Sequence, residues 1–146
     1  MPPAELLYSQ THLWVSCRVG VTLVGVTENG LDQYGDVVAI ELPEPGAELA
    51  YGDDLGELEC IRGVWELYAP LDGVVVEVNT ALLQNPEQIN VDPYGEGWLL
   101  GLELKDRRQL EHLLTAEEYE TLVEEQAGLE EEEEEDEEDT FGLLEE

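Results

Sequence analysis

The sequence predicts a small, mainly β protein with helices near its C-terminus, and three observations lead to this prediction. Short apolar runs alternate with Gly, Pro and Asp over residues 11–104, which is typical of strands joined by turns. Apolar residues recur at helical spacing only after residue 104. The chain has 146 residues, 42% of them apolar, which suits one modest core. We therefore expect a small sandwich or flattened barrel.

Seven segments have the composition of strands. Two of them, 55–60 and 63–68, are so close together that we expect a β-hairpin with Cys60-Ile61-Arg62-Gly63 at its tip. The expected strands are 11–17, 20–26, 36–42, 55–60, 63–68, 73–79 and 98–104.

Two helices are predicted after the last strand. Asp106 can cap a short helix over 107–114. Thr115 and Glu118 have the spacing of a capping box and open a second helix, which Gly128 can end. The apolar positions of this second helix are Ala116, Tyr119, Leu122 and Val123.

Charge separates the chain into a body and a tail. Acidic residues outnumber basic ones 37 to 5, which gives a net charge of −32. Glu130 to Asp139 is an unbroken acidic run that repels itself and buries nothing, with Phe141, Leu143 and Leu144 behind it. We expect one domain over 1–128 and a disordered, low-complexity acidic tail over 129–146. Nucleic acid and anionic membranes are excluded as partners because they would repel this charge.

The sequence holds no recognisable catalytic or metal site. His12 and His112 have no ligand partners at metal spacing, and we interpret the turn-rich segment 92–98 as a packed loop. Cys17 and Cys60 form no metal motif or disulfide framework. Because no catalytic motif is present, we do not expect an enzyme. The N-terminus lacks the features of a secretory or transit signal, so we expect a cytoplasmic protein with reduced thiols.

Several blocks resemble a known family. Residues 25–49 are similar to the first core block of the H protein of the glycine cleavage system, the carrier that holds a lipoyl arm. The segments 77–98 and 115–125 resemble its most recognisable block and its C-terminal helix. The resemblance runs from about Tyr8 to Val123. It implies a biotinyl/lipoyl-type β-sandwich, a hybrid motif of two antiparallel sheets, followed by C-terminal helices.

Two residues depart from the family's pattern. The family's hairpin tip carries a lysine joined to lipoate, and Arg62 stands at that position here. A guanidinium stays protonated and delocalised, so it is no usable nucleophile for lipoyl transfer. The family's first strand has a glutamate that lines the cleft for the amine-loaded arm, where this chain has Leu13. We therefore expect no attached lipoate, nor any other cofactor.

Three functional hypotheses remain open. The first is a non-catalytic module that binds protein partners through Leu13, Glu59, Cys60, Ile61, Arg62 and Gly63. The resemblance implies glycine decarboxylase, aminomethyltransferase, dihydrolipoamide dehydrogenase or a lipoate-attaching enzyme as partners. The second is a working lipoyl carrier in glycine decarboxylation, for which Lys105 is the one lysine available. The third is a thiol carrier using Cys60. For Arg62 itself, the alternative to docking is a solvated turn residue loosely paired with Glu57, Glu59 or Glu66.

Overall fold

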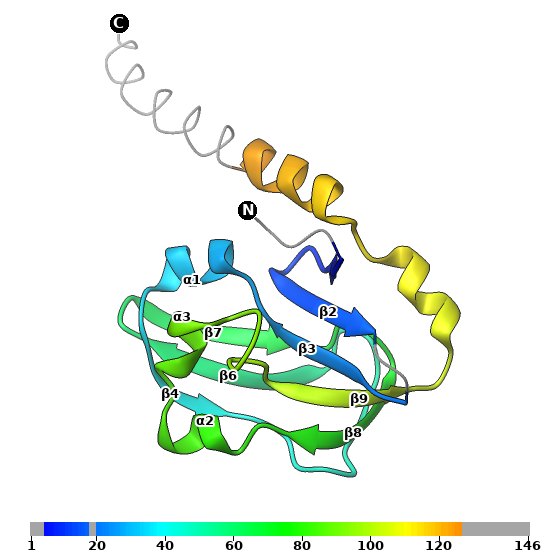
Figure 1. Ribbon diagram of the computed structural model, residues 1–146, viewed down its shortest axis with the longest axis horizontal. Helices are drawn as coiled ribbons and strands as arrows, with labels where there is room; N and C mark the ends of the chain where they lie inside the picture. The colour runs from blue at the N-terminus through cyan, green and yellow to red at the C-terminus, as the bar shows by residue number, and fades with distance from the viewer. Residues whose placement is uncertain (1–4, 18–19, 127–146) are drawn as a thin grey trace, which may run out of the picture.

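The protein folds as two antiparallel sheets packed face to face, as the sequence predicted. The structure is a computed structural model and describes residues 5–17 and 20–126. Its larger sheet has the strand order β1-β2-β3-β9-β8-β5, and its smaller sheet has the order β4-β6-β7 (Figure 1). The larger sheet consists of β1 (Leu7–Tyr8), β2 (Leu13–Cys17), β3 (Thr22–Val26), β5 (Glu48–Leu49), β8 (Gly73–Val78) and β9 (Leu100–Leu104). The smaller sheet consists of β4 (Val37–Glu41), β6 (Asp54–Cys60) and β7 (Gly63–Tyr68).

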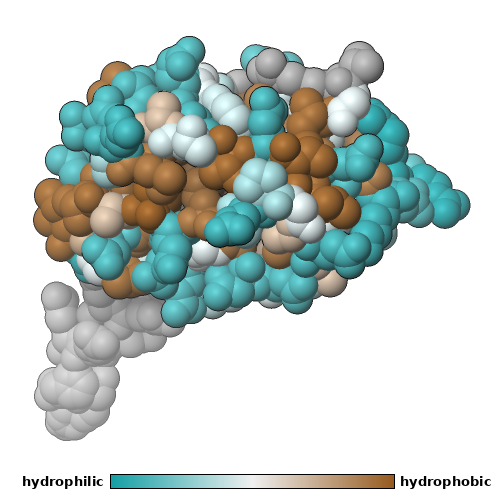
Figure 2. Space-filling model, turned by 90° about the horizontal axis from the view of Figure 1, so that it is seen from below, coloured by the Kyte–Doolittle hydropathy of each residue, from teal (hydrophilic) through white to brown (hydrophobic). Residues whose placement is uncertain are grey.

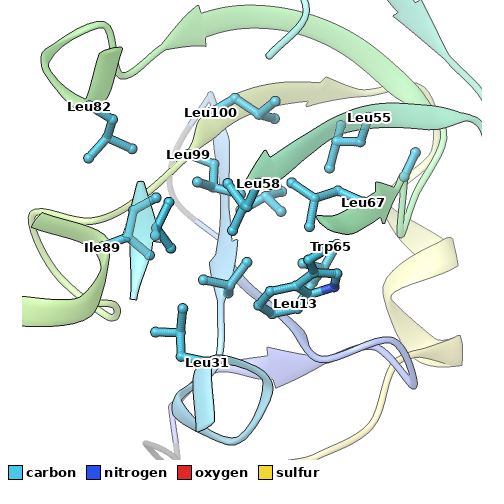
Figure 3. Packing of buried hydrophobic residues seen from close by; sticks show 14 of the residues in the cluster. Leu13, Leu31, Leu55, Leu58, Trp65, Leu67, Leu82, Ile89, Leu99 and Leu100 are labelled. Carbon is cyan, nitrogen blue, oxygen red and sulfur yellow. The ribbon is translucent and has the colours of Figure 1, made fainter. Parts of the chain in front are cut away.

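All seven predicted strands are present, each within a few residues of its expected bounds, and two short strands, β1 and β5, are additional. The main core lies between the sheets, because alternate side chains of each sheet point inward. Leu58 and Leu67 from the smaller sheet meet Leu100 and Val24 from the larger one, and all four are almost fully buried. Figure 3 shows this packing around Leu58, with Leu13 and Trp65 beside it.

Three short helices that the sequence analysis did not predict lie at one end of the sandwich (Figure 1). They are α1 (Glu28–Tyr34), α2 (Ala81–Gln84) and α3 (Gln88–Val91). α1 begins at Thr27, whose side chain accepts a hydrogen bond from Gly30 N at 3.1 Å. Leu31 of α1 points into the main core, and α2 and α3 contribute Leu82 and Ile89 to the same core (Figure 3).

The first predicted C-terminal helix differs from expectation. Residues Arg107–His112 form a 3₁₀-helix, η1, and not an α-helix over 107–114. Asp106 caps it as predicted, accepting from Arg108 N at 2.9 Å. The helix ends early because Leu114 exchanges two backbone hydrogen bonds of 2.8 Å with Tyr8, which requires an extended chain.

The second predicted helix is confirmed, over residues 116–126 of the described chain (Figure 1, orange). Its capping box forms as expected: Thr115 N donates to Glu118 Oε1 at 3.0 Å, and Glu118 N donates to Thr115 Oγ1 at 3.2 Å. This helix places Tyr119 in a second buried cluster with Tyr8, Trp14 and Leu23. Gly128 and the tail over 129–146 lie outside the described residues.

None of the helices in the described part of the chain is long and apolar enough to cross a membrane.

Candidate functional site

The hairpin between β6 and β7 has a two-residue tip. Cys60 pairs with Gly63, which leaves Ile61 and Arg62 to make the turn. Gly63 has a φ of +148°, a conformation that glycine adopts without a Cβ clash, so this residue allows the tight connection. The tip is also held from outside the hairpin, because Ile61 N donates to Asp36 O at 2.9 Å and Arg62 N to Tyr34 O at 3.0 Å. Its backbone position is therefore fixed against the segment that joins α1 to β4.

The Arg62 side chain lies against the C-terminal end of α1. Its Nη1 donates to Asp32 O at 2.5 Å, and its aliphatic part passes over Gly35, where a Cβ would be 3.8 Å from Arg62 Cγ. Asp32 carries one of the last carbonyls of the helix, which have no partner within it. A cation at this end also interacts favourably with the helix dipole, by about 0.3–1 kcal/mol. Arg62 therefore acts as a C-terminal cap for α1.

The suggested ion pairs of Arg62 with Glu57, Glu59 or Glu66 are not observed. In the part of the chain that the structure describes, the one ion pair is between Asp106 and Arg108, at 3.0 Å. Arg62 is exposed, yet it is bound to a helix end and is not a freely solvated turn residue.

An open cleft of about 510 Å³ lies beside the tip. Asn90 closes one side of it: its Oδ1 accepts from Val37 N at 2.8 Å, and its Nδ2 donates to Gly35 O at 3.4 Å. The cleft combines three carboxylates with one guanidinium, so its charge is mainly negative. Its lining residues are Glu28, Leu31, Asp32, Gly35, Asp36, Arg62 and Asn90.

Four of the six proposed partner-binding residues are exposed together at the tip: Glu59, Ile61, Arg62 and Gly63. Ile61 is 68% exposed, which is unusual for so large an apolar side chain.

The other two proposed residues point inward. Leu13 is 0% exposed and packs in the main core, where it pairs with Val26 on β3 (Figure 3). The prediction that Leu13 contacts a partner is therefore corrected, because its side chain does not reach the surface. Cys60 is 9% exposed. Its thiol contacts Leu58 O at 3.8 Å, and burial raises the pKa of this thiol. A buried thiol with a raised pKa is a poor nucleophile.

Exposed apolar residues around the tip were missed by the sequence analysis. Val64 is 52% exposed and lies opposite Glu59 across the hairpin. Val38 is 58% exposed at an irregularity where β4 pairs with the end of β6, and Leu83 on α2 is 54% exposed. Figure 2 shows that, on the face of the molecule seen from below, apolar residues gather between hydrophilic borders. Val38 follows the buried Val37, so the alternation of the strand points it outward, although its apolar side chain gives no sign of exposure in the sequence.

A buried hydrogen-bond network holds the opposite end of α1. Tyr119 Oη lies 2.6 Å from His12 Nδ1 and 2.7 Å from Thr27 Oγ1, the residue that caps the start of α1. The Tyr8 ring stacks on Tyr119 with their centroids 4.8 Å apart. Burial lowers the pKa of His12 and raises that of Tyr119. This network joins the C-terminal helix to β2 and α1 and has a structural role.

The described residues contain no group of three or more His, Cys, Asp or Glu side chains arranged to hold a metal ion. The segment 92–98 is a packed loop as interpreted: Trp14 Nε1 donates to Pro93 O at 2.9 Å, and Asp92 Oδ2 accepts from Glu96 N at 3.0 Å.

Comparison with known proteins gives consistent matches. The family model described as glycine cleavage H-protein matches residues 6–126. The chain is 47% identical over 123 residues to the glycine cleavage system H protein of Symbiobacterium thermophilum, covering 84% of this chain and 96% of that one. The corresponding protein of Oceanobacillus iheyensis is 43% identical, with 84% and 98% covered.

A solved structure gives the same result. The crystal structure of a glycine cleavage system H protein from Mycobacterium marinum superposes with a TM-score of 0.74 at 36% identity. The match covers 81% of this chain and 95% of that one.

Proposed function

Since the chain belongs to the glycine cleavage H-protein family, as its motifs predicted, we propose that it keeps the family scaffold as a non-catalytic, protein-binding module without attached lipoate. The observation that carries this proposal is the position of Arg62 and its hydrogen bond to the end of α1. It stands at the tip position where the family resemblance places the lipoyl-lysine, and its guanidinium is bound to the end of α1.

The residues at the tip do not fit lipoate attachment. Attachment needs an amine that loses its proton and attacks an activated acyl group. Arg62 offers a guanidinium, a group that stays protonated in proteins and whose charge is delocalised over three nitrogens. Its Nη1 is in addition held 2.5 Å from Asp32 O, so the side chain lies along the protein surface. No transfer step through lipoate is therefore assigned to this chain.

The two alternative carrier groups receive less support. Lys105 directly follows β9, and Figure 1 shows the end of β9 on the opposite side of the molecule from α1, against which the hairpin tip lies. An arm on Lys105 would start far from the cleft beside the tip. Cys60 is buried and its pKa is raised, which disfavours the thiolate that a thiol carrier needs.

We place the docking surface at the exposed tip and the apolar residues around it. Ile61 and Val64 supply large apolar side chains, whereas Glu59 and the carboxylates of the neighbouring cleft form an acidic border. An apolar centre with a charged rim is the usual anatomy of a protein interface. Candidate partners are glycine decarboxylase, aminomethyltransferase, dihydrolipoamide dehydrogenase and a lipoate-attaching enzyme.

A lipoylation assay tests the loss of the arm. The wild type, Arg62→Lys and the double variant Arg62→Lys/Lys105→Arg are incubated with a competent lipoate ligase, and their intact masses are measured. We expect labelling of both variants with lysine at position 62 and none of the wild type. A labelled wild-type chain would overturn the proposal.

A binding assay tests the docking surface. Each candidate partner is immobilised, and the wild type is compared with Ile61→Asp and with a control, Val76→Asp, on β8 of the other sheet, where the side chain is 44% exposed. We expect Ile61→Asp to weaken binding at least about tenfold, a loss of roughly 1.4 kcal/mol, while the control binds like the wild type. Equal binding by all three proteins would place the interface elsewhere.

A further inference from the structure

A groove of about 430 Å³ lies between residues 8–10 and η1, which Figure 1 shows on the opposite side of the molecule from α1. Tyr8 and Leu71, both almost fully buried, line it together with Leu113 and Leu114. Tyr51, which is 76% exposed, forms part of its rim. The volume lies within the range of about 300–1,000 Å³ that is typical of ligand pockets.

Hydrogen bonds between side chains and the backbone hold the walls of this groove in place. The side-chain amide of Gln109 on η1 makes two hydrogen bonds to the backbone of Asp72. Asp72 N donates to Gln109 Oε1 at 2.8 Å, and Gln109 Nε2 donates to Asp72 O at 2.9 Å. Tyr51 N donates to the Asp72 carboxylate at 2.6 Å. The groove is therefore formed before any occupant arrives, which reduces the entropic cost of binding.

The wall formed by η1 is next to the most basic part of the chain. Three of the five basic residues fall within Lys105–Arg108, together with one carboxylate, that of Asp106. Arg108 is paired with Asp106, whereas Lys105 and Arg107 are exposed and form no ion pair with another described residue. In a chain of net charge −32, this stretch is the natural place for an acidic segment to bind.

The C-terminal tail has the chemistry that complements both features. Its acidic run, Glu130–Asp139, is followed by Phe141, Leu143 and Leu144. The family match ends at residue 126, so this combination lies outside the part of the chain shared with the H-protein family model.

We propose that Phe141, Leu143 and Leu144 of the same chain occupy this groove, while the acidic run lies along Lys105 and Arg107. The groove is thus a binding site for an acidic segment with an apolar end, and the chain supplies its own ligand. A partner that carries a similar segment would have to displace the tail.

The length of the tail permits this contact. Leu114 lines the groove, and the helix over 116–126 leads about 16 Å away from it, at ~1.5 Å per residue. Fourteen residues lie between Gln126 and Phe141, and a random coil of that length would have a root-mean-square span of about 20 Å. Because this span is close to the distance required, the effective concentration of the tethered segment is in the millimolar range. Weak contacts are then enough for occupancy.

Screening allows the basic stretch to act despite the acidic body. Residues 1–123 carry 23 acidic and 5 basic side chains, and this body repels the tail at long range. At physiological salt the screening length is about 8 Å, so the tail responds mainly to the charges that it passes.

A paramagnetic label on the full chain tests the proposal. A nitroxide is attached at Glu146→Cys in a Cys17→Ser/Cys60→Ser background, and amide NMR signals are compared with the label oxidised and reduced. We expect the oxidised label to lower the signals of Leu71, Asp72 and Leu113 at least twofold. Signals of Ile61 and Gly63 at the hairpin tip should keep their intensity.

Two matched variants and a dilution series complete the test. Replacing Phe141, Leu143 and Leu144 by Ser should restore the groove signals, and Lys105→Glu/Arg107→Glu should restore them in part. Unchanged groove signals with the oxidised label, or an equal effect in the Ser variant, would overturn the proposal. An effect that disappears on dilution would also overturn it, because the tail of a second copy would then fill the groove.

Discussion

The two ends of α1 are held in opposite ways. At its start, Thr27 is fully buried and its hydroxyl lies 2.7 Å from Tyr119, which in turn contacts His12. At its end, the exposed Arg62 donates one hydrogen bond to Asp32 O. Buried polar groups are costly to leave without partners, whereas an exposed group can exchange its partner for water. Stability therefore depends on the first end, and the second end can change with little cost to the fold.

This difference explains how a family scaffold can keep its fold while its tip changes. The backbone hydrogen bond from Arg62 N to Tyr34 O does not depend on the side chain, and the side chain adds one exposed hydrogen bond to α1, so different residues can stand at position 62. The buried end joins three separate segments of the chain and permits few alternatives. The predictions below test this contrast between the two ends.

The largest effect is expected at Tyr119. Tyr119→Ala removes a buried ring that stacks on Tyr8 and leaves His12 and Thr27 without their shared partner. We expect a loss of about 3–5 kcal/mol in the free energy of unfolding, measured by urea denaturation. The control at the other end, Ile61→Ala, should change it by less than about 0.5 kcal/mol. Equal losses would remove the contrast between the two ends.

The next effect is expected in the middle of α1. A Cβ on Gly30 would clash with the Trp65 ring, so Gly30→Ala must displace that ring or the helix. We expect a loss of about 1–3 kcal/mol from overpacking, even though alanine favours helices more than glycine does. Gln33→Ala, at an exposed position of the same helix, is the matched control and should be nearly neutral. A stabilised Gly30→Ala variant, measured by thermal unfolding, would show that the contact relaxes freely.

A smaller effect is expected from pH. Burial lowers the pKa of His12 below the value of 6.5 that it has when unfolded, so the unfolded chain binds this proton more readily. The contribution of His12 is therefore fully present above about pH 6.5 and is lost as the pH falls through the folded pKa.

We expect His12→Asn to lose less stability than the wild type between pH 7.5 and pH 5, measured by urea unfolding at both pH values. Asparagine suits the positive φ of 72° at this position. The control is His112→Asn at the exposed second histidine, which should follow the wild type. Parallel pH profiles for His12→Asn and the wild type would contradict the linkage.

The smallest effect is expected at the tip. Arg62→Ala removes one exposed hydrogen bond to Asp32 O and one cation from the C-terminal end of α1. We expect a loss of about 0.3–1 kcal/mol, with Arg62→Lys retaining the charge and losing less. Chemical denaturation of the three proteins provides the comparison. A loss above about 2 kcal/mol would show that Arg62 is a structural requirement of the fold.

Much of the fold could be predicted from the sequence because its signals are local. Alternating apolar residues defined the strands, and the spacing of Thr115 and Glu118 defined the capping box. The short helix α1 was missed because Asn29-Gly30 is typical of a turn, although Thr27 had the character of a helix cap. Leu114 ended η1 early through a bridge to Tyr8, a long-range contact that local spacing does not indicate.

The candidate site was predicted in part. The hairpin and the exposure of its tip followed from the turn between two strands, and the structure places Ile61, Arg62 and Gly63 there. The contact of Arg62 with Asp32 could not be predicted, because it joins two segments thirty residues apart. Leu13 was assigned to the site by its aligned position, but it lies in the core because its strand alternates inward there.

The measurement that tests the central claim most directly is the intact mass of the protein purified from its own cells, with peptide mapping of residues 57–66 and 98–108. We predict an unmodified chain, with Arg62 and Lys105 both free of any acyl group. A lipoyl adduct on Lys105, or at any other position, would contradict the claim that the scaffold was kept and the arm lost.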